Sequence, residues 1–287
     1  MELMLNSQRA AQLIAITAVM ASTLLSAQTP QHKTFACGPK PTVSVTNEYG
    51  PITVHAGAGN QVVVTYTLHS DKVEVDTNQS GDRITVESHM LAPVNNDAMR
   101  VDYEVLVPAG ASVILRSISG PMSAENLRGE VSMAGEAANM DLRDINDGHI
   151  HLKTLSGTIN LQEIHDVHVE ATTLGGDITM KNVSGPLVDV SSNGGKIYYD
   201  GDFGGSGSYK LNSHSGDIEA NIPATVSMDV TAKSDKGQVD DDFPLQPKTH
   251  SSFVPEKGHS FMGIAGRAAS SVWLHTFSGR IRLKQRK

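Results

Sequence analysis

Glycine-marked turns recur through the middle of the chain at a spacing that few folds accommodate. The turn glycines fall at positions 120, 129, 148, 157, 176, 185, 195 and 216. Where no glycine stands, near 138 and near 166, the interval leaves room for one further turn. Neighbouring turns are thus 9 to 10 residues apart, and the full period is about 19 residues. A fixed period of this length is typical of repeat architectures.

After each turn, apolar and polar residues alternate over a short run. The apolar pairs are Val131 and Met133, Ile150 and Leu152, Ile159 and Leu161, Ile178 and Met180, Ile197 and Tyr199, and Ile218 and Ala220. Since side chains alternate faces along a strand, each pair points to one side. One repeat cannot close a core alone, but stacked coils align the pairs in columns. The pattern predicts an all-β, single-chain β-solenoid, or β-helix-like fold, of about 19-residue coils.

An antiparallel β-sandwich is the alternative, because strands every 8 to 12 residues also describe that class. The regular period and the similarity of the units favour the solenoid. A β-rich N-terminal portion precedes the regular coils. The predicted organisation is a signal peptide at 1–27, a linker at 28–42, the N-terminal β-rich portion at 43–118, regular repeats at 119–239, a loop excursion at 240–268, and closing strands at 269–287.

The N-terminus has the composition of an export signal. Ala10 to Leu25 is apolar and uncharged, Arg9 precedes it, and Ser26-Ala27 supplies small residues. We expect cleavage after Ala27, with membrane contact only through this segment if it stays uncleaved. The mature chain is then periplasmic, surface-located or secreted. Cys37 is the only cysteine, so no intramolecular disulfide can form, and the formal charge of −8 argues against a nucleic-acid partner.

A family resemblance rests on several motifs. Val105 to Gly110 has the form Val-x-Val-Pro-x-Gly, and Ser-Gly-Asp-Ile units follow at Gly176-Asp177-Ile178 and Ser215 to Ile218. Behind an export signal, this combination resembles a bacterial family of exported domains of unknown function regarded as candidate adhesins. The resemblance covers about residues 43 to 285 and implies adhesion without any catalytic residue. Since Thr158 and Lys196 replace the aspartate in other units, these aspartates are interpreted as turn residues.

Histidines and aspartates are the candidates for metal binding. His149, His151, His165 and His168 would suit Zn²⁺ or Cu²⁺ if stacking brought them together. They also suit an ordinary polar outward face, and no metal or other cofactor is predicted. Asp240 to Asp242 lacks the alternate spacing of a calcium loop, so it is interpreted as a solvated charge run.

No catalytic motif emerges. Gly204 to Ser208 is not a nucleophile elbow, and the chain has no His-Glu-x-x-His. Carbohydrate-cleaving β-helices exist, and a pair such as Asp189 with Asp200 could serve one as acid and base, but nothing in the sequence separates these two residues from ordinary exposed aspartates. The basic C-terminal strand, with Arg280, Arg282 and Lys284, suits either an anionic partner or a charged sheet edge that discourages aggregation.

The sequence therefore predicts a non-enzymatic, exported β-solenoid. It would act as a candidate adhesin or cell-envelope scaffold whose polar faces meet an envelope glycan or another surface protein. The alternative is a carbohydrate-active β-helix enzyme. An enzyme should carry a cleft with clustered carboxylates, whereas a scaffold should carry flat polar rows.

Overall fold

The regular structure of this protein consists of β-strands. The computed structural model describes residues 29–91, 99–204, 206–246, 248 and 255–286. The expected signal peptide at 1–27 lies outside the described residues. No helix in the described part is long and apolar enough to span a membrane.

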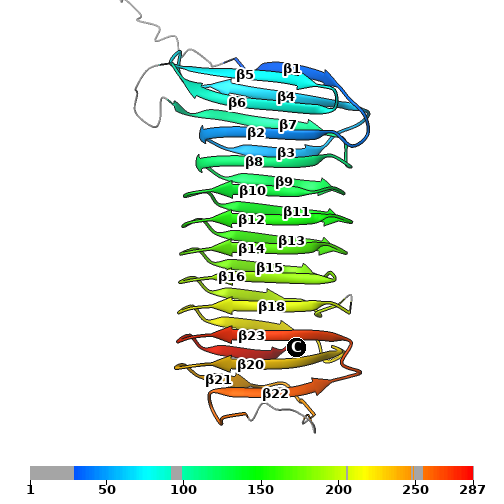
Figure 1. Ribbon diagram of the computed structural model, residues 1–287, viewed down its shortest axis with the longest axis vertical. Helices are drawn as coiled ribbons and strands as arrows, with labels where there is room; N and C mark the ends of the chain where they lie inside the picture. The colour runs from blue at the N-terminus through cyan, green and yellow to red at the C-terminus, as the bar shows by residue number, and fades with distance from the viewer. Residues whose placement is uncertain (1–28, 92–98, 205, 247, 249–254, 287) are drawn as a thin grey trace, which may run out of the picture.

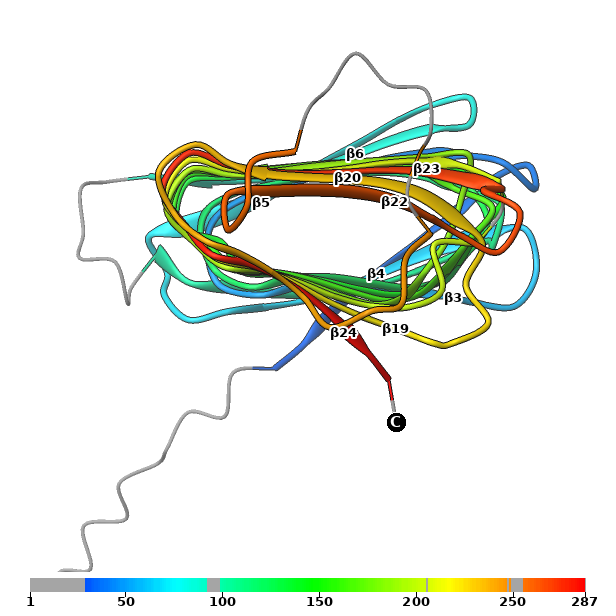
Figure 2. The same cartoon turned by 90° about the horizontal axis from the view of Figure 1, so that it is seen from below.

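Two sheets of twelve strands face each other across the core (Figures 1 and 2). Sheet A runs in the order β1 (Gln31–Ala36), β4 (Gln61–Leu68), β7 (Val101–Val107), β3 (Ile52–Ala56), β9 (Met122–Leu127), β11 (Met140–Asn146), β13 (Ile159–His165), β15 (Ile178–Val183), β17 (Ile197–Asp200), β19 (Ile218–Ile222), β24 (Ile281–Gln285) and β21 (Val239–Asp241). Sheet B runs in the order β22 (Ser260–Ala265), β20 (Met228–Ser234), β23 (Ser270–Thr276), β18 (Ser208–Ser213), β16 (Leu187–Ser192), β14 (His168–Thr173), β12 (His149–Thr154), β10 (Val131–Gly135), β8 (Ser112–Ser119), β2 (Thr42–Tyr49), β6 (Arg83–Met90) and β5 (Val73–Ser80).

From β8 to β19 the chain winds as a solenoid, one strand in each sheet per coil. Neighbouring strands in this region are parallel, and Ile159 pairs with Ile178, which pairs with Ile197. These partners are 19 residues apart, so the predicted period is the pitch of one coil. The solenoid prediction is confirmed. Parallel neighbours at a constant register exclude the antiparallel sandwich for these coils.

Inward side chains form the predicted columns. Ile159, Ile178 and Ile197 stack in one column, and Leu161, Met180 and Tyr199 in the next. All six are at most 1% exposed. Burying an aliphatic side chain of this size contributes roughly 1.5–3 kcal/mol to the free energy of unfolding. The alternation therefore fixes which face of each strand lies in the core.

The N-terminal end differs from its prediction, because part of the expected linker at 28–42 is a strand. Gln31–Ala36 form β1, which pairs antiparallel with β4 at the edge of sheet A. The side chains of β1 are exposed or half-buried on both faces, so its sequence shows no apolar alternation. Because an edge strand is held mainly by backbone hydrogen bonds, its sequence needs no alternation of apolar and polar residues, and the strand could not be predicted from it.

The C-terminal end requires two corrections. The expected loop excursion at 240–268 contains β22, whose Ser260–Ala265 pair antiparallel with β20. The expected closing strands at 269–287 do not close the stack. Instead β23 lies between β18 and β20 (Figure 1), and in sheet A β24 lies between β19 and β21. After β18 and β19 the chain leaves one coil position empty, forms β20 to β22, and then returns to fill that position with β23 and β24. The periodicity predicts which side chains point into the core, but not the order in which the strands are stacked.

Candidate functional site

The corner glycines stand where two coils come closest. A Cβ added to Gly176 would lie 1.9 Å from the carbonyl oxygen of Gly157, and one added to Gly195 would lie 1.9 Å from that of Gly176. Real Cβ atoms do not approach an oxygen so closely. Ala138 occupies the start of this column, where the sequence left room for an unmarked turn. These glycines therefore build the stack and carry no chemistry.

A ladder of buried hydroxyls lines the same corner. The Gly195 N–H donates to Ser192 Oγ (2.9 Å), and Ser192 Oγ donates to the carbonyl of Gly176 one coil below (3.0 Å). In six coils of the described chain, a Ser or Thr hydroxyl accepts the N–H of the glycine three residues later. These residues are Thr154, Thr173, Ser192, Ser213, Ser234 and Thr276. Each hydroxyl satisfies a backbone group that has no ladder partner at the bend. The Ser/Thr-x-x-Gly spacing is a structural motif.

The residue after the corner glycine bonds to the next coil from outside. Asp177 Oδ1 accepts the N–H of Lys196 (2.7 Å), and Asp217 Oδ1 accepts the N–H of Arg280 (2.8 Å). In the same way, Asn139 Oδ1 accepts the N–H of Thr158 (3.0 Å). The aspartate of the Ser-Gly-Asp units is thus engaged in holding coils together.

The four candidate histidines are divided between the sheets. His149 and His168 are neighbours on β12 and β14, with ring centroids 4.8 Å apart. His151 Nδ1 lies 3.2 Å from Glu170 Oε2. His165 ends β13 in sheet A, where its Nδ1 lies 3.1 Å from Ser184 Oγ. Among the described residues, no three His, Cys, Asp or Glu side chains are grouped to hold a metal ion.

The candidate acid and base do not meet. Asp189 points outward from β16 in sheet B, and its Oδ2 lies 3.8 Å from Lys210 Nζ. Asp200 ends β17 in sheet A and forms an ion pair with Arg286. Because the two carboxylates lie on opposite faces of the molecule, they cannot flank one glycosidic bond. This part of the enzyme alternative is wrong.

The basic C-terminal strand is tied to acidic neighbours. Arg282 Nη1 lies 3.5 Å from Asp217 Oδ2, and Lys284 Nζ lies 3.1 Å from Glu219 Oε1. Arg280 pairs with Asp240. The strand is also interior to sheet A, so the charged-edge interpretation is wrong. Its cations bind β19 and β21 to β24.

Asp240 to Asp242 do not converge on one point. Asp240 faces Arg280, which holds the pKa of the Asp240 carboxyl below its usual value through a hydrogen bond. Asp241 Oδ1 accepts the N–H of Phe243 (3.0 Å), and burial raises the pKa of the Asp241 carboxyl. The two carboxylates serve different partners.

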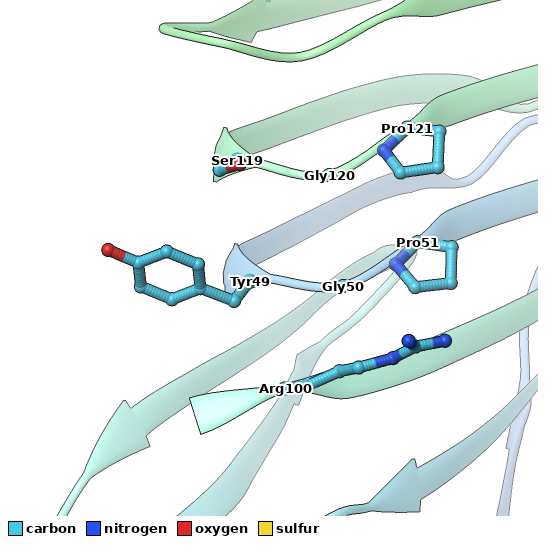
Figure 3. A pocket seen from close by; sticks show the side chains of 7 residues that line it. All are labelled: Tyr49, Gly50, Pro51, Arg100, Ser119, Gly120 and Pro121. Carbon is cyan, nitrogen blue, oxygen red and sulfur yellow. The ribbon is translucent and has the colours of Figure 1, made fainter. Parts of the chain in front are cut away.

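A hollow of about 470 Å³ lies toward the N-terminal end of the stack (Figure 3). Two Gly-Pro turns build it, Gly50-Pro51 and Gly120-Pro121, one coil apart. Gly50 has a φ of +106°, in the region that favours glycine. Arg100 borders the hollow, and its Nε lies 2.7 Å from Asp102 Oδ1. The residues that line it include no carboxylate, nucleophile pair or apolar patch that would indicate chemistry.

A second hollow, of about 490 Å³, crosses several coils of sheet B. We call it the axial groove. Its walls are two rows of outward side chains, and its floor is the hydroxyl ladder. The first row is Thr172, Ser191, Asn212 and His275, the second is Leu174, Asn193, His214 and Phe277, the floor is Thr173, Ser192 and Ser213, and Asp235 lies at one end.

The sequence did not predict the axial groove. The alternation predicts outward positions within the strands, whereas the residues of the second row lie at the corner of each coil, directly after the Ser or Thr of the hydroxyl ladder. The signal available in the sequence was the position after each Ser/Thr of the Ser/Thr-x-x-Gly motif, which carries Leu174, Asn193, His214 and Phe277 in successive coils. Trp273, the chain's one tryptophan, stands on β23 beside His275 of the first row, outside the groove lining, and is 39% exposed.

Comparison with protein families accounts for the coil pattern. The family model described as Toastrack DUF4097 matches residues 42–284. The chain belongs to the Toastrack family. The matched region takes in β2 to β23 and most of β24. This membership confirms the resemblance drawn from the sequence motifs. The family description names a domain of unknown function, so it assigns the Toastrack chain no activity.

Three solved structures are similar to this chain at low sequence identity. A candidate adhesin from Bacteroides fragilis is 10% identical, with a TM-score of 0.45, over 90% of this chain and 98% of that one. A candidate adhesin from Parabacteroides distasonis is 10% identical, with a TM-score of 0.43, over 91% and 98%. A candidate cell adhesion protein from Clostridium sporogenes is 12% identical, with a TM-score of 0.30, over 90% and 100%. No curated protein matches the chain.

Proposed function

We propose that this Toastrack chain is an exported, non-enzymatic β-solenoid of the cell envelope. It acts as an adhesin-like scaffold that presents its polar sheet faces to an envelope glycan or to another surface protein. The proposal rests on how the outward carboxylates are arranged and bonded. They are spread along rows and bonded to neighbouring coils, as Asp177, Asp217 and Glu219 are.

The carbohydrate-active alternative requires two carboxyl groups flanking one bond. A hollow of about 250 Å³ on sheet A does contain two, Glu125 and Asp141. Glu125 Oε1 lies 2.8 Å from His55 Nδ1, and Asp141 Oδ1 accepts a hydrogen bond from Asn160 (2.7 Å). Each carboxylate is engaged by the residue paired with it on the adjacent strand, which favours a structural role.

The test is co-sedimentation of the purified chain from Gln28 onward with isolated peptidoglycan sacculi, followed by analysis of the polymer. We expect saturable retention with the polymer recovered at its original length. Release of soluble fragments would support the enzyme instead. In that case loss of release in Glu125→Gln and Asp141→Asn would identify the acid and base.

A further inference from the structure

The axial groove runs along the stacking direction, across β14, β16, β18 and β23. Its two rows come from successive coils, so outward positions repeat at the inter-strand spacing although the residue types differ from coil to coil. The three spacings between these four strands, each about 4.8 Å, make the groove about 14 Å long. A ligand that fills it must be extended and must repeat on a similar scale. An oligosaccharide strand has such a form, with one sugar unit at a time meeting one or two coils.

One end of the groove is aromatic. The rings of His214 and Phe277 stack, with centroids 4.9 Å apart and planes 10° apart. Lys236 Nζ lies 4.7 Å from the centroid of Phe277. The rings of Trp273 and His275 follow, with centroids 6.3 Å apart. Phe, Trp and Tyr make up only 5% of this chain, yet Phe277 and Trp273 both project outward here, each beside a histidine ring. Ring faces offer apolar, electron-rich surface, on which the C–H face of a sugar packs.

The rest of the groove offers uncharged hydrogen-bonding groups. The side chains of Asn193, Asn212 and Ser191 make no hydrogen bond to any other described residue. The outward asparagines of sheet A behave differently, since Asn160 donates to Asp141 (2.7 Å) and Asn221 to Tyr198 (2.8 Å). The groove amides are therefore available to the hydroxyls of a ligand.

The charge in the groove is compensated internally. Asp235 is the one carboxylate among the lining residues. Hydrogen bonds from Lys233 and His275 hold the pKa of the Asp235 carboxyl below its usual value. The distances are 2.5 Å to Lys233 Nζ and 3.0 Å to His275 Nε2. A carboxyl held ionised is a poor general acid, and with no second carboxylate the groove is suited to binding without cleavage.

We propose that the axial groove binds a neutral oligosaccharide strand laid along the solenoid axis. Sugar rings pack along the stacked His214–Phe277 pair and on Trp273, which flanks His275 on the other side of the groove, while Asn193 and Asn212 hydrogen-bond to hydroxyl groups. This inference rests on the proposed function, because it names the ligand class and the place where an envelope scaffold would hold it.

The single tryptophan is a built-in reporter for this site. The purified chain from Gln28 onward would be titrated with chitohexaose and with cellohexaose, exciting at the red edge of tryptophan absorption. We expect a saturable change in Trp273 fluorescence with at least one of these neutral hexamers. A hexamer of hyaluronan, which is anionic, should bind at least about tenfold more weakly, since Asp235 repels an anion at that end of the groove and the Lys236 ammonium already lies over the Phe277 ring.

Two variants separate binding from folding. Phe277→Ala should lower the affinity about tenfold, because it removes one ring of the stacked pair. The double variant Asn193→Ala/Asn212→Ala should lower it about fivefold and leave the melting temperature unchanged, since neither amide bonds to the fold. Asn160→Ala on sheet A is the matched control and should titrate as the unaltered chain does.

No fluorescence change with either neutral hexamer at millimolar concentration would overturn the groove inference. Unaltered affinity in both the Phe277 and the double asparagine variants would overturn it as well, as would tighter binding of the anionic hexamer or of a peptide. Retention on peptidoglycan sacculi is measured separately. A chain that sediments with sacculi but ignores the hexamers would keep the proposed function and lose only this site.

Discussion

At the scale of single residues, the absence of one methyl group decides whether two coils can meet. Gly176 and Gly175 are adjacent, and a Cβ at either would meet a carbonyl oxygen of the coil below, at 1.9 Å for Gly176 but at 3.8 Å for Gly175. Neither has a positive φ, so the requirement at Gly176 is one of space. We therefore expect the fold to tolerate a larger residue at Gly175 but not at Gly176.

Gly176→Ala should therefore destabilise the fold by about 3 kcal/mol or more, since its Cβ would lie 1.9 Å from the Gly157 carbonyl oxygen. Gly175→Ala should stay within about 0.5 kcal/mol, because the nearest atom is 3.8 Å away. Urea denaturation followed by circular dichroism measures both. Similar losses for the two variants would contradict the close-approach account of the corner.

Glu219 joins three strands of sheet A through its charge. Its carboxylate lies 3.1 Å from Lys284 Nζ and 3.5 Å from Lys196 Nζ, and its side chain is 13% exposed. Burial would raise the pKa of Glu219, but the hydrogen bonds and charges of Lys284 and Lys196 outweigh it and lower that pKa from 4.5. The two lysines thus favour the ionised form in the folded chain.

Because the folded pKa lies below the unfolded one, the ion pairs stabilise the fold above about pH 4.5, and the stabilisation is lost as pH falls through the folded pKa. Glu219→Gln should remove this part of the pH dependence. The exposed Glu130→Gln should leave it in place. Thermal melts between pH 7 and acidic pH would test it, and an unchanged profile in Glu219→Gln would exclude the role.

At the scale of the strand, alternation separates core from surface. Ile178 is 0% exposed and stands between Ile159 and Ile197, whereas Thr179 points to the opposite face. Ile178→Asp should cost several kcal/mol, since it buries an unpaired carboxylate. Thr179→Asp should cost within about 0.5 kcal/mol. Equal shifts in melting temperature would disprove the assignment of faces.

The strands that could be predicted were those whose inward side chains repeat. From Val131 to Ala220, the apolar pairs predicted both the strands and their stacking, because a buried column demands the same residue type in every coil. The ends could not be predicted in this way. The strand β1 lies at a sheet edge with little burial, and β23 and β24 lie between strands that come earlier in the sequence. Any coil with the same inward apolar side chains would pack equally well at that position.

At the scale of the whole molecule, the two faces are chemically different. Ion pairs link coils on both sheets, as Glu219 with Lys284 does on sheet A and Asp189 with Lys210 on sheet B, but the axial groove with its aromatic end lies on sheet B. The sequence singled out histidines and aspartates as candidates, but the coil geometry distributes them. It did not reveal the groove, since that surface arises only when corner residues about 20 positions apart, such as Asn193 and His214, are stacked.

Export is a further expectation for the whole chain. The uncharged run from Ala10 to Leu25 predicts cleavage after Ala27. Mass spectrometry of the protein from its native host should find a mature N-terminus at Gln28. Recovery of the chain with Met1 intact would refute the cleavage.

The central claim is that function resides in a repeated surface with no indispensable catalytic group. The most direct measurement is retention on peptidoglycan sacculi for His151→Ala, Asp177→Ala, Asp189→Ala and Asp217→Ala, each with a melt to confirm the fold. A binding surface loses little at each position, so every variant should keep its affinity to within about tenfold. Removing a general acid or base typically costs 10²–10⁴-fold. One folded variant that abolished retention, or any release of fragments by the unaltered chain that a single substitution stopped, would contradict the account.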